Sequence, residues 1–524
     1  SCRWAFRSIL PLAAMPMTPN GKIDRKALPE PEREERVIDP PENELQTLLC
    51  GFYQKALDLK EVGVNEDFFE LGGNSLKAAQ VLMAARLKEL PISYQDIFDA
   101  KTVRRLEAAI EQKRKGESAL PSPKAAEPTE AELAALAHNR NDYVDEIGKG
   151  SLGNVLLTGA TGFLGAHVLR YLLEHTEEKI YCLLRPHGKD VRQKLENLLF
   201  YYFENDYAGE FDRRLFALEG DITNPESLES TAGLDYHTVI NCAASVKHFA
   251  DMEFLKAVNV HGVENLTRLC LEKGARLVQI STTSVGGMAV GGLKLGQMLR
   301  EDSLDIGQDV ESNAYVYTKY LAEKHVLKSI EEKGLDGKII RVGNLSSRVR
   351  DGEFQINFST NAFMNTLRAY AVLGCYPFVG MSEIVELSYI DETARAVVLL
   401  SGTGRDFTVF HAYNGYTVKM GDIVAAMNHC GIPVECVAME EFKRRLQEGL
   451  AREDINGYLS VLVRYGREDG EKLETIPTDN RFTLNALYRL GFHWTITDMT
   501  IIEQMLGALK TLGFFDCAAE ARGR

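Results

Sequence analysis

Residues 155–165 read VLLTGATGFLG, a short apolar run that passes directly into a glycine-rich turn. The run at 155–158 has the length and composition of a buried strand. Gly159, Gly162 and Gly165 follow at intervals of three, and a helical pattern continues after them. Glycines at this spacing allow a tight turn, a close approach of the backbone to a pyrophosphate, and close packing of helix on strand. The stretch therefore predicts a dinucleotide-binding turn.

The alternation of strand and helix continues toward the C-terminus. Apolar runs separated by helical patterns lie at 155–158, 180–184, 215–218, 238–241, 277–281 and 338–342. Strands that alternate with helices pair in parallel, because each crossover helix returns the chain to the same end of the sheet. The pattern predicts an α/β, doubly wound Rossmann sheet.

The residue after the second predicted strand bears on which dinucleotide binds. Arg185 lies about twenty residues past the glycines, where NAD enzymes of this fold tend to carry an acid for the ribose 2′-hydroxyl. A guanidinium at this position suits the 2′-phosphate of NADP instead. The alternative interpretation is an ordinary surface cation.

A tyrosine–lysine pair in residues 314–323 (AYVYTKYLAE) predicts proton chemistry. Tyr315 and Lys319 are four residues apart, which places them on one face of a helix. A free tyrosine has a pKa of about 10, and a neighbouring ammonium should lower that pKa by stabilising the phenolate. A second pair, Tyr320 and Lys324, lies five residues further on, or about 500° around the helix, so we expect it to be structural.

Residues 71–76 (LGGNSL) indicate a different site in the N-terminal part of the chain. They follow residues 67–70 (DFFE) and precede a helical pattern at 75–90. Ser75 would then lie at a helix N-terminus, where backbone N–H groups favour a phosphate. Apolar residues at helical spacing predict a small helical unit over 42–115. The alternative interpretation is a turn with a helix cap, because Asn and Ser both cap helices.

The overall composition excludes several classes of protein. A formal net charge of −15 argues against nonspecific nucleic-acid binding, and a content of 45% hydrophobic and 26% charged residues is that of a globular chain. No apolar run reaches about 18 residues, so no membrane span is expected. The nine cysteines form no Cys-x-x-Cys pair, which fits a reducing, cytoplasmic location without zinc or disulfides. His248 and His261 have no metal-ligand partner at useful spacing.

Together these motifs resemble the terminal carrier–reductase didomain of nonribosomal peptide synthetases, and also carboxylic acid and aminoadipate reductases. Residues 71–76 resemble the attachment site of peptidyl carrier proteins. The glycine turn and residues 314–323 resemble extended short-chain dehydrogenases/reductases. Residues 18–29 (TPNGKIDRKALP) resemble the closing motif of adenylation domains, with Lys22 matching its catalytic lysine. The chain has no initiator methionine, so we expect it to begin inside a larger protein.

The resemblance implies four segments. They are the tail of an adenylation domain at 1–30, a four-helix peptidyl carrier domain at 42–115, a linker at 116–150 and an NAD(P)-dependent thioester reductase at 151–524. The reductase should have a Rossmann core at about 151–350 and a smaller substrate-binding subdomain at about 351–524, with residues 386–391 leading into it. The linker is rich in Lys, Glu, Ala, Pro and Ser and lacks a long apolar pattern, so the carrier should be mobile relative to the reductase and dock transiently.

The resemblance also assigns residues to roles. Ser75 would carry 4′-phosphopantetheine. Thr282, Tyr315 and Lys319 would be catalytic, with Thr283 as the alternative to Thr282. Val342 stands where the family's Arg-Pro-Gly turn has proline. The positions expected to contact NADPH are Gly159, Thr161, Gly162, Phe163, Leu164, Gly165, Arg185, Asp221, Ile222, Ala243, Ala244, Lys319, Gly343 and Asn344.

The implied activity is NADPH-dependent reductive release of a carrier-bound peptidyl or aminoacyl thioester as an aldehyde, or as an alcohol after a second hydride. The implied partners are upstream adenylation and condensation domains, a phosphopantetheinyl transferase, and the reductase on which the carrier docks. No nucleic acid, membrane or metal is expected. Two alternatives use the same fold: a non-redox cyclising release domain, and a carrier-linked sugar-type epimerase or dehydratase. Tyr315 argues against the first, and the carrier motif argues against the second.

Overall fold

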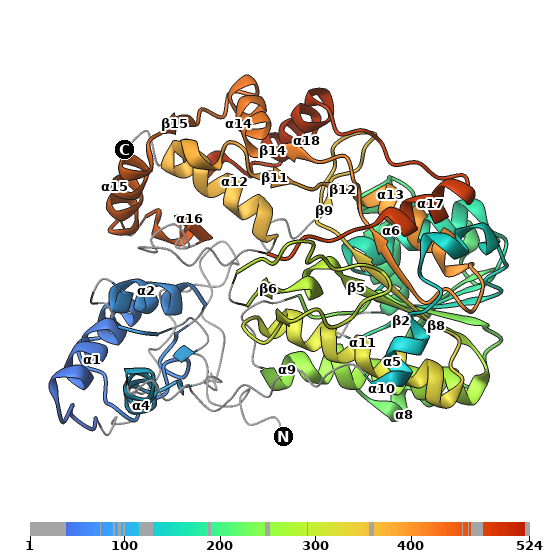
Figure 1. Cartoon of the computed structure of the whole chain (residues 1–524), viewed down its shortest axis with the longest axis horizontal. Helices are drawn as coiled ribbons and strands as arrows, with labels where there is room; N and C mark the ends of the chain where they lie inside the picture. The colour runs from blue at the N-terminus through green and yellow to red at the C-terminus, as the bar shows by residue number, and fades with distance from the viewer. Residues whose placement is uncertain are drawn as a thin grey trace, which may run out of the picture. The chain divides into compact units, whose positions relative to one another are not determined.

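The computed structural model of the chain describes residues 38–518 apart from short gaps. The gaps are residues 74, 87, 89, 93–95, 98–99, 115–128, 187–189, 247–251, 291, 356–360, 453, 460 and 463–474. The adenylation-like stretch with Lys22 and the residue His248 lie outside the described residues. The chain divides into two compact units, Ser1–Ala119 and Leu120–Arg524 (Figure 1).

The first unit is a small helical bundle. Its described helices are α1 (Glu44–Leu57), α2 (Ser75–Arg86) and α4 (Val103–Arg114). Four helices were predicted for this bundle, and the fourth is not among the helices that the structure describes. The core forms around Phe68, which is fully buried and whose ring centroid lies 4.6 Å from that of Tyr53.

The two glycines of the LGGNSL motif have a packing reason. Gly72 has a φ of 91°, which is the left-handed region that favours glycine. A Cβ at Gly73 would lie 2.4 Å from the carbonyl oxygen of Phe68, so only glycine lets the chain fold back over that ring. The chain then enters α2 at Ser75, which confirms the predicted helix start.

The second unit is built on a seven-stranded parallel sheet with the order β13-β8-β5-β4-β1-β2-β3. The strands are β1 (Val155–Thr158), β2 (Ile180–Leu184), β3 (Leu215–Glu219), β4 (Thr238–Asn241), β5 (Arg276–Thr282), β8 (Gly337–Val342) and β13 (Val409–Ala412). The strand order reverses between β1 and β4, and this is where parallel α/β sheets bind their ligands. Six of the strands match predicted runs to within a residue, and β13 was not predicted.

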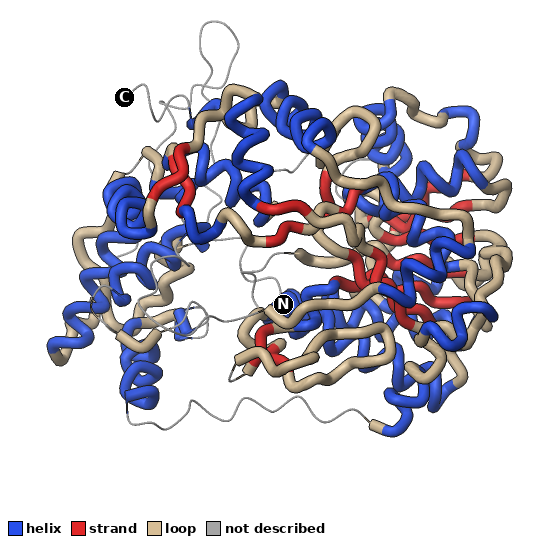
Figure 2. Tube along the Cα trace, turned by 45° about the horizontal axis from the view of Figure 1, so that its top comes forward, coloured by secondary structure: helices blue, strands red, loops and turns tan. Residues whose placement is uncertain are grey.

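Helices cover both faces of this sheet (Figures 1 and 2). On one face lie α6 (Phe163–His175), α7 (Val191–Phe203), α13 (Ile390–Ser401) and α17 (Arg481–Arg489). On the other lie α8 (Pro225–Glu229), α10 (Gly262–Lys273) and α11 (Ala314–Lys333). Neighbouring residues of one strand point to opposite faces, so Leu156 joins the core under α10 and α11 while Val155 and Leu157 join the core under α6.

A C-terminal subdomain has a hydrophobic core of its own. It consists mainly of α12 (Ala362–Leu373), α14 (Met420–His429), α15 (Met439–Leu450), α16 (Asn456–Leu459) and α18 (Met499–Thr511). It also contains two short strand pairs, β10 (Cys375–Pro377) with β15 (Glu435–Val437) and β11 (Ile384–Val385) with β14 (Val418–Lys419). After entering the subdomain, the chain returns to the main sheet as α13, β13 and α17. The predicted boundary near residue 350, between a Rossmann core and one continuous C-terminal subdomain, is therefore too simple.

The second half of the predicted linker is folded against the reductase. Helix α5 (Glu130–Ala135) begins with a capping box between Thr129 and Glu132. Asn139 is buried, and its side-chain amide donates to Thr408 Oγ1 at 2.9 Å, beside β13. Residues 129–150 thus belong to the second unit, and the predicted boundary at 150 is wrong because buried polar contacts, rather than a long apolar pattern, hold this segment.

Candidate active site

The glycine-rich turn lies at the carboxyl end of β1, where the sheet order reverses. Gly159 has a φ of 71°, and a Cβ on it would lie 2.5 Å from the backbone nitrogen of Ala243 in the turn after β4. A Cβ at Gly165 would lie 2.1 Å from the Gly159 carbonyl oxygen. The glycines therefore bring β1, β4 and α6 together, and the close packing of this helix on the first strand was predicted from the sequence.

The N-terminus of α6 suits the pyrophosphate of a dinucleotide. Gly162 is its N-cap and has no side chain to cap it, so the first N–H groups of a 13-residue helix face the end of β1. Thr161 is partly exposed beside this end. Leu164 is buried in the core and can meet a cofactor through its backbone only, whereas Phe163 is partly buried against the same core.

Three other predicted cofactor contacts follow β2 and β3. Arg185 is exposed immediately after β2. The carboxylate of Asp221 accepts hydrogen bonds from the backbone N–H and the hydroxyl of Thr223, both at 2.9 Å. Ile222 is buried under Gly262, where a Cβ would lie 2.8 Å from Ile222 Cδ1. The partly exposed Asp221, the buried Ile222 and an exposed guanidinium thus line the same edge.

Asn241, at the end of β4, is buried and begins the predicted cofactor-lining turn, but its hydrogen bonds could not be predicted from the sequence. Its side-chain oxygen accepts from the Thr158 hydroxyl at 2.5 Å and from the N–H of Ala243 at 3.2 Å. Its amide donates to the Gln279 side chain at 2.7 Å. One fully buried amide therefore joins β1, β4 and β5 and shapes the turn that contains Ala243 and the exposed Ala244.

The structure brings the three predicted catalytic residues together at the carboxyl end of β5. Thr282 is the last residue of that strand, and its hydroxyl oxygen accepts from the N–H of Ser284 at 3.1 Å. The side chains of Thr282 and Tyr315 share a hydrogen bond. Lys319 lies one turn along α11 and donates to the carbonyl oxygen of Ile280 at 2.6 Å. Thr283 begins the next turn of 3₁₀-helix and is partly exposed.

The protonation behaviour of the pair differs from the expectation. Burial raises the pKa of Tyr315 to about 12, and the hydrogen bond from Thr282 only partly offsets this. Burial also lowers the pKa of Lys319 to about 8, against the opposing charge of Glu323. The expected lowering of the tyrosine pKa is therefore absent, because loss of water around the hydroxyl raises this pKa more than the hydrogen bond with Thr282 lowers it.

Asn259 supports this arrangement from behind, and no sequence signal pointed to it. It lies in the π-helical turn η3 (Ala257–His261) and is buried. Its side-chain oxygen accepts from the N–H of Ser245 at 2.8 Å, and its amide donates to the Thr318 hydroxyl at 3.1 Å. The turn after β4 is thus held against α11 next to Lys319.

A fully buried ion pair lies behind the catalytic strand. Arg341 of β8 binds Glu323 of α11, with Nη2 and Oε2 2.7 Å apart, and Glu323 also accepts from Ser281 of β5 at 2.5 Å. Arg341 donates to His411 Nε2 at 2.9 Å, and His411 Nδ1 donates to the carbonyl oxygen of Asp479. This arrangement makes His411 neutral, and burial lowers its pKa well below the usual value.

Gly343 and Asn344 follow β8, but in this structure they contact a carboxylate. A Cβ at Gly343 would lie 2.3 Å from Oε2 of Glu386, and the N–H of Asn344 donates to the same oxygen at 2.6 Å. Glu386 was predicted only to begin a segment that leads into the substrate-binding part. The sequence could not show this contact, since 42 residues separate Asn344 from Glu386.

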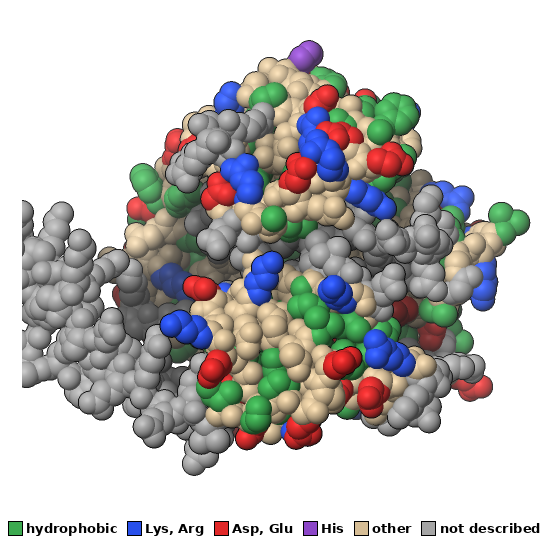
Figure 3. Space-filling model, turned by 90° about the vertical axis from the view of Figure 1, so that its left-hand side faces the viewer, with side chains coloured by type: hydrophobic (Ala, Val, Ile, Leu, Met, Phe, Trp, Pro, Cys, Tyr) green, Lys and Arg blue, Asp and Glu red, His purple; other side chains and the backbone are tan. Residues whose placement is uncertain are grey.

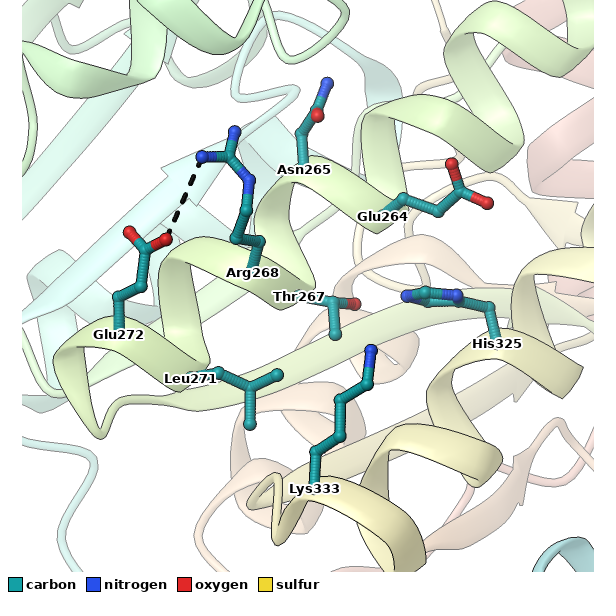
Figure 4. A pocket seen from close by; sticks show the side chains of 8 residues that line it. All are labelled: Glu264, Asn265, Thr267, Arg268, Leu271, Glu272, His325 and Lys333. Atoms are coloured by element: carbon teal, nitrogen blue, oxygen red, sulfur yellow. Dashed lines mark ion pairs between the residues drawn. The ribbon is translucent and has the colours of Figure 1, made fainter.

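The remaining ionisable candidates lie away from the cofactor edge. His261 is exposed and pairs with Glu264 at 2.9 Å. An open pocket between α10 and α11 is lined by Glu264, Asn265, Thr267, Arg268, Leu271, Glu272, His325 and Lys333 (Figure 4). Its side chains come from the outer surface of the two helices and include the Arg268–Glu272 ion pair at 3.8 Å. This pocket is separate from the glycine turn and from Tyr315.

Acidic and basic side chains are interspersed on the face drawn in Figure 3 and do not gather into a patch of one sign. Among the described residues, no group of three or more His, Cys, Asp or Glu could hold a metal ion. No described helix is both long and apolar enough to cross a membrane.

The fold and the site together define an NAD(P)-binding reductase of the extended short-chain dehydrogenase type, preceded by a carrier domain. Residues 157–397 match the family model described as male sterility protein, and residues 43–110 match the phosphopantetheine attachment site. The solved thiolation–reductase didomain of an archaeal non-ribosomal peptide synthetase is similar at 33% identity and a TM-score of 0.80, over 92% of this chain and 100% of that chain. The chain belongs to this family of thiolation–reductase didomains, which are NAD(P)H-dependent thioester reductases.

Longer proteins also contain a similar segment. A linear gramicidin synthase of Brevibacillus parabrevis is 28% identical over 83% of this chain and 9% of that protein. The L-2-aminoadipate reductase of Candida glabrata, in its large subunit, is 24% identical over 94% of this chain and 38% of that protein. The chain thus spans about a tenth to two-fifths of the length of these relatives.

Proposed function

We propose that this chain releases a peptidyl or aminoacyl group from its own carrier by NADPH-dependent reduction of the thioester to an aldehyde. The observation that carries the proposal is the hydrogen-bonded Thr282–Tyr315 pair, with Lys319 beside it, in a chain that also contains the carrier motif at Ser75. The reaction consumes one thioester, one NADPH and one proton, and yields an aldehyde, a thiol and NADP⁺. A second round on the aldehyde would give an alcohol.

Each residue of the site has a separate task in this proposal. The 4′-phosphopantetheine arm on Ser75 would present the thioester, and NADPH would supply the hydride. Thr282 and Tyr315 donate hydrogen bonds to the carbonyl oxygen as it becomes negative, which is where a fixed donor lowers the barrier most. Tyr315 then delivers the proton. Lys319 opposes the high pKa of the buried tyrosine while negative charge develops nearby.

The residues around the edge of the sheet fit NADPH. The uncapped N-terminus of α6, with Gly159, Thr161, Gly162 and Gly165, would hold the pyrophosphate. Asp221, Ile222, Ala243 and Ala244 would line the adenosine and nicotinamide ends, and Gly343 and Asn344 would lie beyond Thr282. The exposed Arg185 would pair with the 2′-phosphate.

The proposal includes partners and location. We propose that upstream adenylation and condensation domains load the carrier, that a phosphopantetheinyl transferase modifies Ser75, and that the carrier docks on its own reductase in the cytoplasm. The adenylation-like residues 18–29 and the carrier motif support the first two steps.

The central experiment loads the carrier and identifies the product. The protein is converted to its holo form with a broad transferase and an aminoacyl coenzyme A, and mass spectrometry then follows the released product with and without NADPH. An aldehyde or alcohol that requires NADPH is expected, and Ser75→Ala should neither gain mass nor release product. Release of an acid or a cyclic amide without NADPH would instead favour the cyclising alternative.

A second experiment tests the cofactor assignment. Arg185→Ala should raise the KM for NADPH far more than the KM for NADH, because only NADPH has the 2′-phosphate. Losing one charged hydrogen-bond partner costs about 1.5–3 kcal/mol, or roughly 10- to 150-fold. Steady-state kinetics with a soluble acyl-pantetheine thioester measure both constants. Equal changes for the two cofactors would show that Arg185 does not contact the phosphate.

A further inference from the structure

A carboxylate lies one strand away from Thr282, at the same edge of the sheet. Val342, the last residue of β8, pairs with Thr282, and Glu386 covers the next residue, Gly343. Neighbouring strands are about 4.8 Å apart, so the carboxylate lies close to the place where Thr282 and Tyr315 would hold a thioester carbonyl. Only glycine at position 343 leaves room for the carboxylate so close to the backbone.

The position of this carboxylate is set by donors that are all neutral. The N–H of Asn344 donates to Oε2 at 2.6 Å, and the hydroxyl of Ser388 donates to Oε1. Ser388 is oriented for this, because its own oxygen accepts from the N–H of Asn414 at 3.0 Å. The same N–H of Asn414 also acts on the carboxylate, so it is shared between the two side chains. A carboxylate has about four acceptor positions, so room remains for a further donor.

No cation among the described residues balances the charge of this carboxylate. Among the described residues, no Lys, Arg or His nitrogen lies within ion-pair distance of Glu386, and enclosure by the protein raises its pKa to about 7. The side chain nevertheless remains partly exposed, so a ligand can reach it. An enclosed carboxylate without a counter-ion costs free energy in the empty protein, and such groups are concentrated at functional sites.

We propose that Glu386 recognises an amine on the acyl group, so that the preferred substrates of this reductase are aminoacyl thioesters with a free amino group. The inference rests on the function proposed above and names its substrate class. An ammonium next to the thioester carbonyl would supply both the missing donor and the missing positive charge. A simple acyl group, or an amino group blocked as an amide, would supply no charge.

Three soluble thioesters of equal carbon number test the proposal. Alanyl-, β-alanyl- and propionyl-pantetheine differ in the presence and position of the amine, and N-acetylalanyl-pantetheine blocks it. The wild-type enzyme should reduce at least one of the two aminoacyl thioesters with a kcat/KM about 10- to 150-fold above that for propionyl, the size of one charged hydrogen bond. The N-acetyl compound should lose this advantage.

Substitution of the carboxylate should remove the preference and leave the basal reaction. Glu386→Gln should bring the aminoacyl thioesters down to the propionyl rate, while Glu386→Asp keeps part of the preference. The matched control is Glu301→Gln. Glu301 is also an enclosed carboxylate with a pKa raised to about 7, but it accepts from Thr483 and not from the turn after β8. The preference should survive in this variant.

A binding measurement separates recognition from turnover. The unreactive thioethers 2-aminopropyl- and propyl-pantetheine, titrated by calorimetry, should differ in Kd for the wild type and not for Glu386→Gln. Equal losses for all thioesters in Glu386→Gln would overturn the proposal and make Glu386 a residue that only positions the turn. A wild type without amine preference would overturn it as well. Failure of the wild type to reduce even propionyl-pantetheine would instead count against the proposed function.

Discussion

Helix α11 carries two tyrosine–lysine pairs with the same spacing, and the surroundings of the two pairs differ. Tyr315 shares a hydrogen bond with Thr282 at the end of β5, and Lys319 donates to the carbonyl oxygen of Ile280. Tyr320 is buried with no hydrogen-bond partner for its hydroxyl in the described structure, and Lys324 lies 3.6 Å from Glu132 of α5. The same spacing therefore places Tyr315 in a hydrogen bond at a strand end. On the other face it places Tyr320 in the core, with Lys324 in an ion pair with α5.

The difference comes from the partner element that each face of the helix meets. The face of Tyr315 meets the carboxyl ends of parallel strands, where side chains and backbone groups of several strands converge. The face of Tyr320 meets α5, a helix from the segment before the sheet. A motif defined by spacing thus acquires its role from the strand ends around it. Substitution of Tyr315 should therefore lower turnover, whereas substitution of Tyr320 should leave turnover unchanged and raise stability.

The largest effect is expected behind the catalytic face, at Glu323. Glu323→Gln leaves Arg341 fully buried without its counter-ion, and breaking such a pair costs about 3–5 kcal/mol. Urea unfolding of the reductase, followed by near-ultraviolet circular dichroism, measures the free energy of unfolding. Arg170→Gln, which removes a partly exposed i,i+4 pair with Glu174, is the control and should cost less than about 1 kcal/mol. Similar losses of unfolding free energy in the two variants would contradict the idea that burial makes the Arg341–Glu323 ion pair important for stability.

The next effect should appear at Tyr315 and be absent at Tyr320. Tyr315→Phe removes the proton and one donor to the developing oxyanion, and losing such a donor lowers kcat about 10²- to 10³-fold. The assay is NADPH oxidation with a soluble acyl-pantetheine thioester, which does not depend on carrier docking. Tyr320→Phe should turn over at the wild-type rate. The reverse result would mean that the other pair is catalytic.

The pH dependence of turnover should follow the loss of the proton from Lys319. Its pKa is lowered to about 8 by burial, with Glu323 and Cys242 acting in the opposite direction. The cation is present below pH 8 and is lost as the pH rises above it, so kcat should fall by up to about tenfold per pH unit on the alkaline side. Removing the nearby negative charge in Glu323→Gln should move the fall to lower pH. A kcat that stays flat to pH 10 would mean that the lysine charge is not used.

The smallest effect should be a gain in stability at Tyr320. The buried hydroxyl of this residue has no partner among the described atoms, and an unsatisfied buried polar group costs about 1–3 kcal/mol. Tyr320→Phe should therefore raise the free energy of unfolding, by about 1 kcal/mol once the loss of small contacts is included. Thermal unfolding measures this change, and a clear loss of stability would mean that the hydroxyl does have a hydrogen-bond partner.

The sequence by itself determined the Rossmann turn, six of the seven strands, the start of α2 at Ser75 and the common face of Tyr315 and Lys319. All of these depend on local spacing, and a period of two or 3.6 residues is visible without knowledge of the fold. The capping box of α5 was also visible as Thr129 and Glu132 three residues apart, although the segment was assigned to the linker.

Only the tertiary structure decided which side chains lose water and which meet across long stretches of chain. Glu386 reaches Asn344 across 42 residues, Arg341 reaches His411 across 70, and β13 joins the sheet after the chain has left it for the subdomain. The raised pKa of Tyr315 and the lowered pKa of Lys319 have the same origin, because burial depends on what packs around a residue and not on its neighbours in sequence.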